Sequence, residues 1–429
     1  MKTVKSLPIL AMLLGVIIVA AAISTVSVEG RKHHVKKIKP KHRRHSKNTP
    51  TGSPAPAPYP STNEGVFNIF SYGAKGDGVS DDSKALVGAW KAACKVVGGK
   101  VEIPAGKQFL VKAVTLQGPC KEETVVQIEG ILVAPEKIGS WPNSSLFQWL
   151  NFKWVSHLTI QGSGTLNGRG SNWWNLDTYQ TQALRFYSSN NVTVRDISIV
   201  NSPLCHLKFD DSDGVKVNNV TISSPENSPN TDGIHLQNTR NVEIQHSNIA
   251  CGGLGKDKSV ACVSDIIVED ISIQNTLAGV RIKTWQGGLG VVKNLTFSNI
   301  QVKDVKVPIV IDQYYCDKSK CKNQTRAVSI SGVKYNNIVG SFTVQPVRIA
   351  CSNNVPCMDV DLMDIRLRPS GGIRGLQTHQ QQQALCWNSY GKTQGPLVPS
   401  SIGYCLRKSN IGGYYSQKVS RSYDKICPS

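Results

Sequence analysis

Apolar residues recur along most of the chain in a short pattern, in which two alternating pairs of apolar positions are separated by two other residues. Copies of this pattern begin at residues 191, 214, 241, 265, 294, 327 and 359, and a looser copy begins at His157. Alternation with a period of two is typical of β-strands. Because the strand pair recurs at intervals typical of solenoid repeats, with Asn and Gly at the joints, we predict an all-β solenoid, a parallel β-helix whose turns stack on one another.

Other repeat folds fit the pattern less well. A hairpin sandwich needs tight turn signals every eight to twelve residues, and these are sparse here. A leucine-rich repeat would have a regular ladder of leucines, which the chain lacks. Residues 82–96 are predicted to form a helix, since Ala85, Leu86, Ala89, Trp90 and Ala93 fall on one face. We expect this helix to cap the N-terminal end of the solenoid.

The N-terminal part of the chain, up to position 62, differs from the rest. Lys2 and Lys5 precede an apolar run over residues 7–23, which predicts a secretory signal peptide in residues 1–25; an uncleaved anchor is the alternative. Residues 26–62 form a basic and then Pro-rich tail, whose composition allows no core. The predicted β-helix domain spans residues 63–429.

Charge is concentrated in the same tail. Residues 1–47 hold eleven Lys or Arg and a single acid, Glu29, which is half of the formal net charge of +20. Such a polycation binds nucleic acid, anionic lipid or acidic polysaccharide, and charge alone does not choose among these partners. His33, His34, His42 and His45 offer a weak metal-binding alternative to a solvated run.

Twelve cysteines in a secreted chain favour disulfides. Sequence proximity predicts the pairs Cys316–Cys321 and Cys351–Cys357, and Cys94–Cys120 is a plausible longer pair. Five glycosylation sequons, which are consistent with a glycoprotein, lie at Asn143, Asn191, Asn219, Asn294 and Asn323.

The stretch SPNTDGIHLQN, residues 228–238, carries the first candidate chemistry. It places the Asp232 carboxylate beside Gly233 at the end of a solenoid turn, with Asn230 and His235 able to contact a sugar. Taken alone, the same residues also fit an ordinary Asn/Asp/Gly turn between strands.

Two further stretches carry cations and aromatic rings. In GVRIKTWQGG, residues 279–288, Arg281 and Lys283 are two positions apart in a strand and so share a face, which suits a substrate carboxylate; a solvated basic edge is the alternative. In PIVIDQYYCD, residues 308–317, Tyr314 and Tyr315 lie at a strand end, where one of them could contact a sugar ring.

These stretches, together with FNIFSYGAKGDGVSDD, GTLNGRGSNWW and FDDSDGVKVNNVTI, resemble the plant-type polygalacturonase family of glycoside hydrolases from about residue 66 to residue 427. The resemblance implies a right-handed parallel β-helix that hydrolyses the α-1,4 links of homogalacturonan with inversion and without a cofactor. It implies that Asp232 is the catalytic base. It assigns substrate binding to the following residues: Asn230, His235, Arg281, Lys283, Tyr314 and Tyr315.

Part of the family's active site is missing from this chain. The family pattern calls for a G-D-D segment one turn after NTD and a C-G-P-G-H-G segment another turn later. Here the copy that begins at position 241 is followed by the copy at position 265, an interval that leaves room for one turn, and ACGGLGK at 250–256 contains neither segment. A repeat solenoid can lose a whole turn and still stack, so we expect a folded protein with weak or absent catalysis.

Candidate replacements for the missing acid are poor. Asp210 and Asp211 lie one turn before Asp232 and fit an acidic turn, and Asp257 has a lysine on each side. A pectin-binding wall protein without catalysis is therefore an alternative to a hydrolase. A pectate lyase is less well supported, because no acidic cluster for calcium is visible. For either of the first two functions we expect a secreted, monomeric, cell-wall protein whose partner is pectin, without nucleic acid and without stable membrane insertion.

Overall fold

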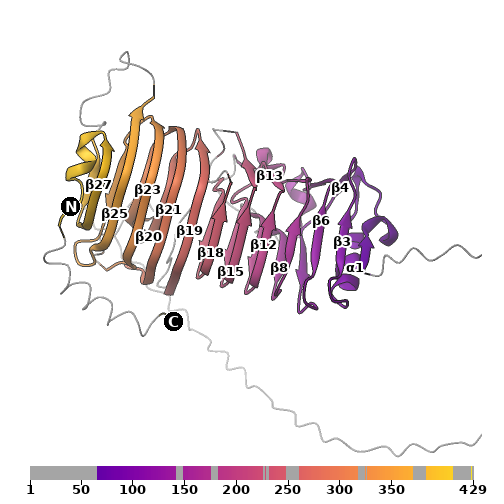
Figure 1. Ribbon diagram of the computed structural model, residues 1–429. Coiled ribbons are helices and arrows are strands. Elements are labelled where there is room, and N and C mark those ends of the chain that lie inside the picture. The colour runs from indigo at the N-terminus through magenta and orange to yellow at the C-terminus, as the bar shows by residue number, and fades with distance from the viewer. Residues whose placement is uncertain are drawn as a thin grey trace, which may run out of the picture. The chain divides into compact units, whose positions relative to one another are not determined.

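The computed structural model describes residues 65–141, 148–174, 182–225, 228, 231–247, 260–316, 324, 326–370, 383–408 and 427. All of them belong to one unit of the chain, Thr62–Ser429, and they form the right-handed parallel β-helix that the repeat and the resemblance predict (Figure 1). The predicted signal peptide, basic tail and histidine tract lie outside the described residues. Within the described residues, no helix has the length and apolar character needed to cross a membrane.

Parallel strands stack in four sheets. The long sheet contains β1 (Val66–Asn68), β3 (Lys100–Ile103), β6 (Val125–Ile128), β9 (Thr159–Gln161), β12 (Asn190–Arg195), β15 (Asp213–Asn218), β18 (Arg240–Gln245), β19 (Val260–Gln274), β21 (Leu289–Val305), β23 (Ser329–Phe342), β25 (Cys357–Pro369) and β27 (Ser389–Val398). The six-stranded sheet contains β2 (Asp77–Asp81), β4 (Gln108–Leu110), β7 (Ile131–Val133), β10 (Thr165–Asn167), β13 (Ser198–Val200) and β16 (Thr221–Ser223).

The remaining two sheets follow each other along the third side of the solenoid, and we call their outward surface the front face. The five-stranded sheet contains β5 (Val114–Gln117), β8 (Gln148–Lys153), β11 (Gln182–Tyr187), β14 (Leu207–Asp210) and β17 (Ile234–Gln237). The four-stranded sheet contains β20 (Ala278–Trp285), β22 (Val307–Tyr315), β24 (Val347–Ala350) and β26 (Leu385–Trp387).

Asn and Asp residues make the corners between strands. Asp270, Asn299 and Asn337 stack at one corner with φ of 56°, 54° and 53°, a left-handed conformation that these short polar side chains tolerate. The Asn299 Nδ2 donates to Asp270 Oδ1 at 3.1 Å, and the Asn337 Nδ2 donates to Asn299 Oδ1 at 3.0 Å. The polar joints of the repeat therefore form ladders that hold one turn on the next.

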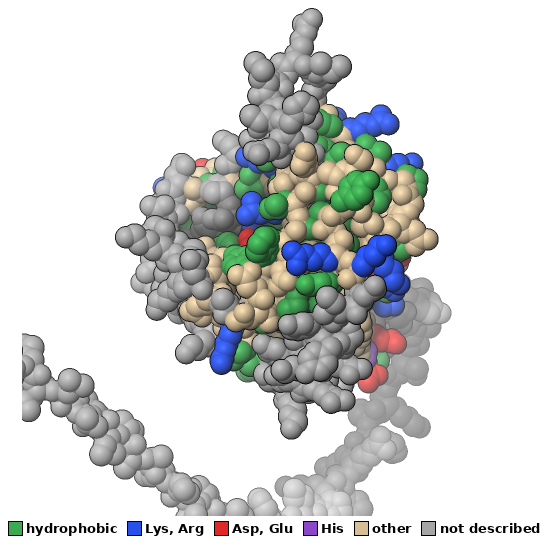
Figure 2. Space-filling view, turned by 90° about the vertical axis from the view of Figure 1, so that its left-hand side faces the viewer, with side chains coloured by type: hydrophobic (Ala, Val, Ile, Leu, Met, Phe, Trp, Pro, Cys, Tyr) green, Lys and Arg blue, Asp and Glu red, His purple; other side chains and the backbone are tan. Residues whose placement is uncertain are grey.

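Both ends of the stack are covered in part. The helix α1 (Ser83–Ala93) caps the N-terminal end and buries the five residues that the sequence placed on one face. At the other end, the 3-10 helix η7 (Ser400–Tyr404) lies against β27 and is tied to β26 by the Cys386–Cys405 disulfide. Figure 2 views this C-terminal end, where hydrophobic side chains form separate patches among Lys and Arg side chains.

Aromatic rings form the core of the N-terminal half. Phe152, Phe186 and Phe209 occupy matching positions on successive strands and stack with ring centroids 5.3 and 4.9 Å apart. Trp90 of α1 meets Phe152 edge to face at 5.3 Å. The next residue in this row is Leu236 on β17, where the stack of rings ends.

Two expectations need comment. The copy of the repeat assigned to residues 327–335 is wrong by five residues, because Leu295 pairs with Val333 rather than with Val328. The error of five residues arises because the apolar positions repeat every five residues here, at 328, 333 and 338, so that the pattern fits both alignments. The Cys94–Cys120 and Cys351–Cys357 disulfides are confirmed. Cys316 is disulfide-bonded, and its predicted partner Cys321 lies outside the described residues.

The stretch around residue 250 affects the sheets unequally. In the long sheet, Arg240 of β18 pairs with Ser264 of β19, so these strands are direct neighbours. On the front face, the five-stranded sheet ends at β17 and the four-stranded sheet begins at β20. The connecting segment, residues 248–259, lies outside the described residues. We call the division of the front face between β17 and β20 the junction.

Candidate active site

Asp232 lies at the last described turn before the junction, immediately before β17. Its backbone carbonyl accepts hydrogen bonds from the His206 backbone N–H at 2.9 Å and from His206 Nδ1 at 3.0 Å. The other ring nitrogen of His206 lies 2.9 Å from Ser224 Oγ. Burial lowers the pKa of His206 to about 4, against the opposing effect of the backbone carbonyls of Asp232 and Ser223. His206 is therefore a neutral, buried support that fixes the backbone of Asp232.

Arg281 and Lys283 lie on the other side of the junction, on β20. Val280 and Ile282 point into the core, so the alternation of the strand turns the two cations to the front face. This is the shared face that the GVRIK stretch predicts. Burial lowers the pKa of the Lys283 ammonium; attraction to Asp232 and Asp312 opposes this, and Arg281 adds to it.

The two sides of the junction interact electrostatically. Burial raises the pKa of the Asp232 carboxyl, while the charges of Lys283 and then Arg281 act to lower it. The Asp232 carboxyl is therefore close enough to Lys283 and Arg281 for their charges to act on its pKa.

Aromatic side chains lie against Arg281 and Lys283. The Tyr315 ring centroid lies 4.2 Å from Lys283 Nζ and 5.7 Å from Arg281 Cζ, and Trp285 meets Tyr315 edge to face at 5.1 Å. We call Arg281, Lys283, Trp285 and Tyr315 the first seat. Tyr314 points elsewhere: its hydroxyl donates to Asn353 Oδ1 at 3.4 Å.

Asp312 is an acidic neighbour of the first seat that the sequence did not single out. It pairs in register with Lys283 on the adjacent strand. One of its oxygens lies 3.9 Å from an Arg281 nitrogen, and the other accepts the Tyr314 backbone N–H at 3.0 Å. Asp312 thus forms a long ion pair with Arg281. Asp312 could have been predicted from the strand alternation in the stretch IVID, next to Tyr314 and Tyr315.

His235 continues a basic row across the five-stranded sheet. It pairs in register with Lys208, which in turn pairs with Arg185. Asn230 lies outside the described residues, so its position relative to Asp232 is not described. The substrate-binding roles of Asn230 and His235 stay predictions.

Asp210 is not the acidic turn that the sequence suggested. It is the last residue of β14, its side chain is 6% exposed, and it pairs with Arg185 Nε at 2.6 Å and Lys208 Nζ at 3.2 Å. Asp211 follows at the corner with φ of 50°. His246 lies at a corner of the long sheet, with Nε2 3.7 Å from Asp270 Oδ2. Asp257 lies outside the described residues.

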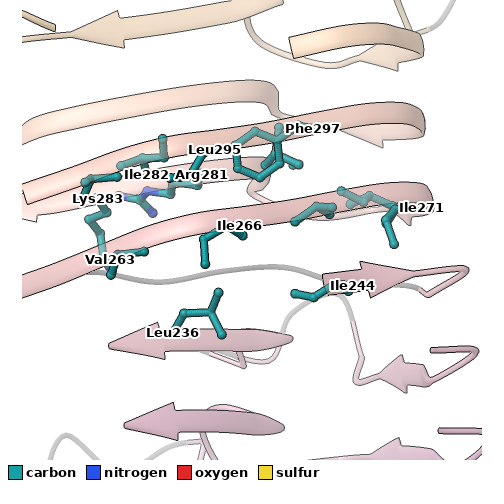
Figure 3. A pocket seen from close by; sticks show the side chains of 15 residues that line it. Leu236, Ile244, Val263, Ile266, Ile271, Arg281, Ile282, Lys283, Leu295 and Phe297 are labelled. Atoms are coloured by element: carbon teal, nitrogen blue, oxygen red, sulfur yellow. The ribbon is translucent and has the colours of Figure 1, made fainter. Parts of the chain in front are cut away.

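A cavity of about 80 Å³ lies in the core beneath the junction (Figure 3). Apolar side chains from both sides line it, among them Leu236 of β17, Ile266 of β19 and Ile282 of β20, and Arg281 and Lys283 contribute to its wall. The stack of phenylalanine rings ends at its edge. A void in the core therefore lies at the place where the front face is divided.

This arrangement supplies recognition more completely than catalysis. Inverting hydrolysis of a glycoside requires two carboxyl groups, one acid and one base, on opposite sides of the bond. Around the first seat, the described residues offer Asp232 for this purpose, since Asp312 is engaged with Arg281. Elsewhere in the described part of the chain, no group of three or more His, Cys, Asp or Glu side chains is arranged to hold a metal ion.

Comparison with known proteins gives a consistent relationship. The profile of Glycosyl hydrolases family 28 matches residues 94–253 and 249–386, two segments that meet at the junction. A polygalacturonase of Persea americana is 36% identical over 363 residues, covering 75% of this chain and 77% of its own. Polygalacturonase QRT2 of Arabidopsis thaliana is 34% identical over 388 residues, covering 79% and 85%.

Solved structures share the fold at lower identity. An endo-xylogalacturonan hydrolase from Aspergillus tubingensis superposes with a TM-score of 0.62 at 18% identity, covering 77% of this chain and 99% of its own. A polygalacturonase from Erwinia carotovora gives 0.55 at 21% identity, covering 77% and 94%. With the profile match and the plant relatives, these observations lead to one conclusion: the chain belongs to Glycosyl hydrolases family 28.

Proposed function

We propose that this protein is a polygalacturonase-type hydrolase of pectin that binds α-1,4-galacturonan through the first seat and cleaves it slowly or not at all. The observation that carries the proposal is the electrostatic interaction of Asp232 with Lys283 and Arg281 across the junction. Arg281 binds a galacturonate carboxylate, Tyr315 supports the sugar ring, and Asp232 acts as the base that activates water.

The loss of one turn is the reason for the reduced rate. The direct pairing of β18 with β19 supports it, as does the break in the family profile at residues 249–253. The base without its acid cannot protonate the leaving oxygen in the same displacement, and such a contribution is worth about 10²–10⁴ in rate.

A pectin-binding wall protein without catalysis is the second candidate. Two sets of ion pairs favour it: Asp210 pairs with Arg185 and Lys208, and Asp312 pairs with Arg281. Each carboxylate that could replace the missing acid therefore already has a basic partner. Secretion to the cell wall and a monomeric state belong to both candidates.

A reducing-end assay on polygalacturonate distinguishes the candidates. We expect the chain to release reducing ends at a rate lower than a full-motif relative by about 10² or more. A hydrolase with residual activity loses it in Asp232→Asn, whereas a binder has none to lose. Unsaturated products absorbing in the ultraviolet would instead indicate a lyase.

Binding is tested separately from turnover. Arg281→Ala is expected to weaken binding to polygalacturonate by about tenfold and Lys283→Ala by less, because only Arg can form two parallel hydrogen bonds with a carboxylate. Equal affinity of both variants and the parent in binding isotherms would remove the first seat from the proposal. Deletion of residues 31–47 is expected to weaken retention on de-esterified pectin and to flatten its salt dependence.

A further inference from the structure

The front face continues beyond the first seat, and its residues stay in register. Lys283, Asp312, Ala350 and Trp387 occupy equivalent positions on β20, β22, β24 and β26. A second row of equivalent positions contains Arg281, Val310, Arg348 and Leu385. Adjacent strands lie about 4.8 Å apart, so Trp387 is about 14 Å from the Lys283 position, and Arg348 is about 10 Å from the Arg281 position.

Trp387 and Arg348 are exposed side chains on this face. The indole of Trp387 is 52% exposed, which is unusual for so large an apolar group. Arg348, on the adjacent strand, is also exposed. Ala350, the residue directly beside Trp387, has only a methyl group as its side chain, so it leaves space next to the indole.

The Trp387 ring is held in place by Asn353. Its Nε1 donates to Asn353 Oδ1 at 2.9 Å, and the Tyr314 hydroxyl donates to the same oxygen at 3.4 Å. Because the indole N–H can only donate, the amide must present its oxygen to Trp387 and its N–H groups elsewhere. Asn353 thus connects Tyr314, one residue from the first seat, to the exposed indole.

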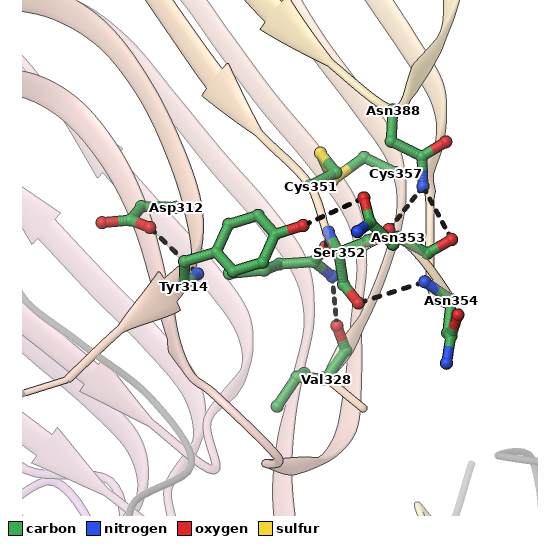
Figure 4. The surroundings of a disulfide bond; sticks show 10 residues. Asp312, Tyr314, Val328, Cys351, Ser352, Asn353, Asn354, Cys357 and Asn388 are labelled. Atoms are coloured by element: carbon green, nitrogen blue, oxygen red, sulfur yellow. Dashed lines mark hydrogen bonds between the residues drawn. A yellow bond between two sulfur atoms is a disulfide. The ribbon is translucent and has the colours of Figure 1, made fainter. Parts of the chain in front are cut away.

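The loop that carries Asn353 is tied down by a disulfide and by hydrogen bonds (Figure 4). The Cys351–Cys357 disulfide closes it. The buried side chain of Gln313 accepts the Ser352 backbone N–H at 2.6 Å and donates to the Val328 carbonyl at 2.7 Å. Asn388, next to Trp387 in sequence, donates to the Asn353 carbonyl at 3.3 Å. The indole is therefore ordered before any ligand binds, which reduces the entropy lost on binding.

We propose that Arg348 and Trp387 form a second seat for an acidic sugar of the same pectin chain, two to three strands beyond the first seat. The inference rests on the proposed function, since it extends the same polysaccharide across the front face. It repeats the composition of the first seat: a guanidinium for the carboxylate and an aromatic ring for the apolar C–H face of the sugar. Galacturonan carries a carboxylate on each sugar, so one chain presents both features to both seats.

The test compares ligands of two lengths and two charges. Affinities of the full chain, Trp387→Ala and Arg348→Gln are measured for digalacturonate, for a long oligogalacturonate and for its methyl-esterified form. We expect Trp387→Ala to weaken both long ligands about two- to tenfold. Arg348→Gln is expected to weaken only the de-esterified one. Neither variant should alter binding of digalacturonate, which fills the first seat alone.

Matched controls separate the second seat from general surface effects. Tyr404→Ala removes an aromatic ring that is 90% exposed at the same end of the solenoid, and Arg368→Gln removes an exposed arginine from the long sheet. Long-ligand affinities of Trp387→Ala and Arg348→Gln equal to those of these controls would overturn the second seat. If Trp387→Ala and Arg348→Gln weaken binding of the long ligands but Arg281→Ala does not, the first seat is contradicted and the second seat is supported. A parent chain that binds no form of the ligand contradicts both.

Discussion

Two sides of the same solenoid respond differently to the stretch around residue 250. In the long sheet, β18 is hydrogen-bonded directly to β19, and the ladder continues through twelve strands. On the front face, the strands are divided between two sheets, and a cavity lies beneath the division. Among the described residues, the long sheet is therefore continuous past the junction, and the interruption lies on the face that carries Asp232, Arg281 and Lys283.

The strongest test of this contrast restores the missing turn. A relative's segment from G-D-D to G-H-G, inserted between Ile249 and Gly252, is expected to raise turnover of polygalacturonate by about 10²–10⁴. The long sheet should accept the extra strand because each turn contacts only its neighbours. Asp232→Asn in the inserted protein should abolish the gain. A parent chain already as fast as the relative would contradict the missing-turn interpretation.

Core truncations should cost more in the N-terminal half than at the junction. Phe186→Ala removes the middle ring of the Phe152–Phe186–Phe209 stack and is expected to lower the free energy of unfolding by about 3–5 kcal/mol. Ile282→Ala, beside the existing cavity, should cost about 2 kcal/mol, at the lower end for such a change. Denaturant unfolding measures both, and equal losses would remove the difference in packing.

The buried His206 imidazole, which lies on the N-terminal side of the junction, predicts that the free energy of unfolding depends on pH. Its pKa is about 4 in the folded protein, against an ordinary value of 6.5. Between these values the unfolded chain binds more protons, so the free energy of unfolding falls as the pH drops from 6.5 towards 4, by about 3 kcal/mol in full. His206→Gln should flatten the profile in this window. An unchanged profile would assign the dependence to other groups.

The smallest expected effect comes from filling the cavity. Leu236→Phe extends the row of stacked rings by one turn and is expected to raise the free energy of unfolding by about 0.5–2 kcal/mol. The matched control is Leu207→Phe, at a fully buried position of the adjacent strand, which should cost about 1–3 kcal/mol through overpacking. Destabilisation by both substitutions would mean that the cavity cannot accept a ring.

The periodic features of the fold were the predictable ones. Alternation, the spacing of the copies and the Asn and Gly joints depend on local sequence, and they predicted the stacked strands. The apolar face of residues 82–96 predicted the helix in the same way. The same alternation misaligned the copy at 327, because the apolar pattern there recurs every five residues and therefore fits two alignments. The direct β18–β19 pairing was predictable for the same reason as the other turns.

The site was predictable where strand alternation decides which side chains share a face, as for Arg281 and Lys283. The residues that pair between successive turns could not be predicted from the sequence, because the intervals between copies of the repeat vary. The contact of Asn353 with Trp387, 34 residues apart, and the engagement of Asp210 by Arg185, 25 residues apart, depend on such pairings. The same reason left the Cys262–Cys427 disulfide unforeseen.

That disulfide gives the protein a mechanical property. Cys262 lies in β19, the first described strand after the junction, and Cys427 follows it 165 positions later in the sequence, so the turns from β20 to β27 are enclosed in one covalent loop. A pull on the C-terminus is therefore transmitted to β19 through sulfur, and the turns from β20 to β27 carry no load. A protease that cuts within the loop leaves both pieces attached. The first and second seats lie on strands inside this loop, so a pull on the C-terminus does not load them.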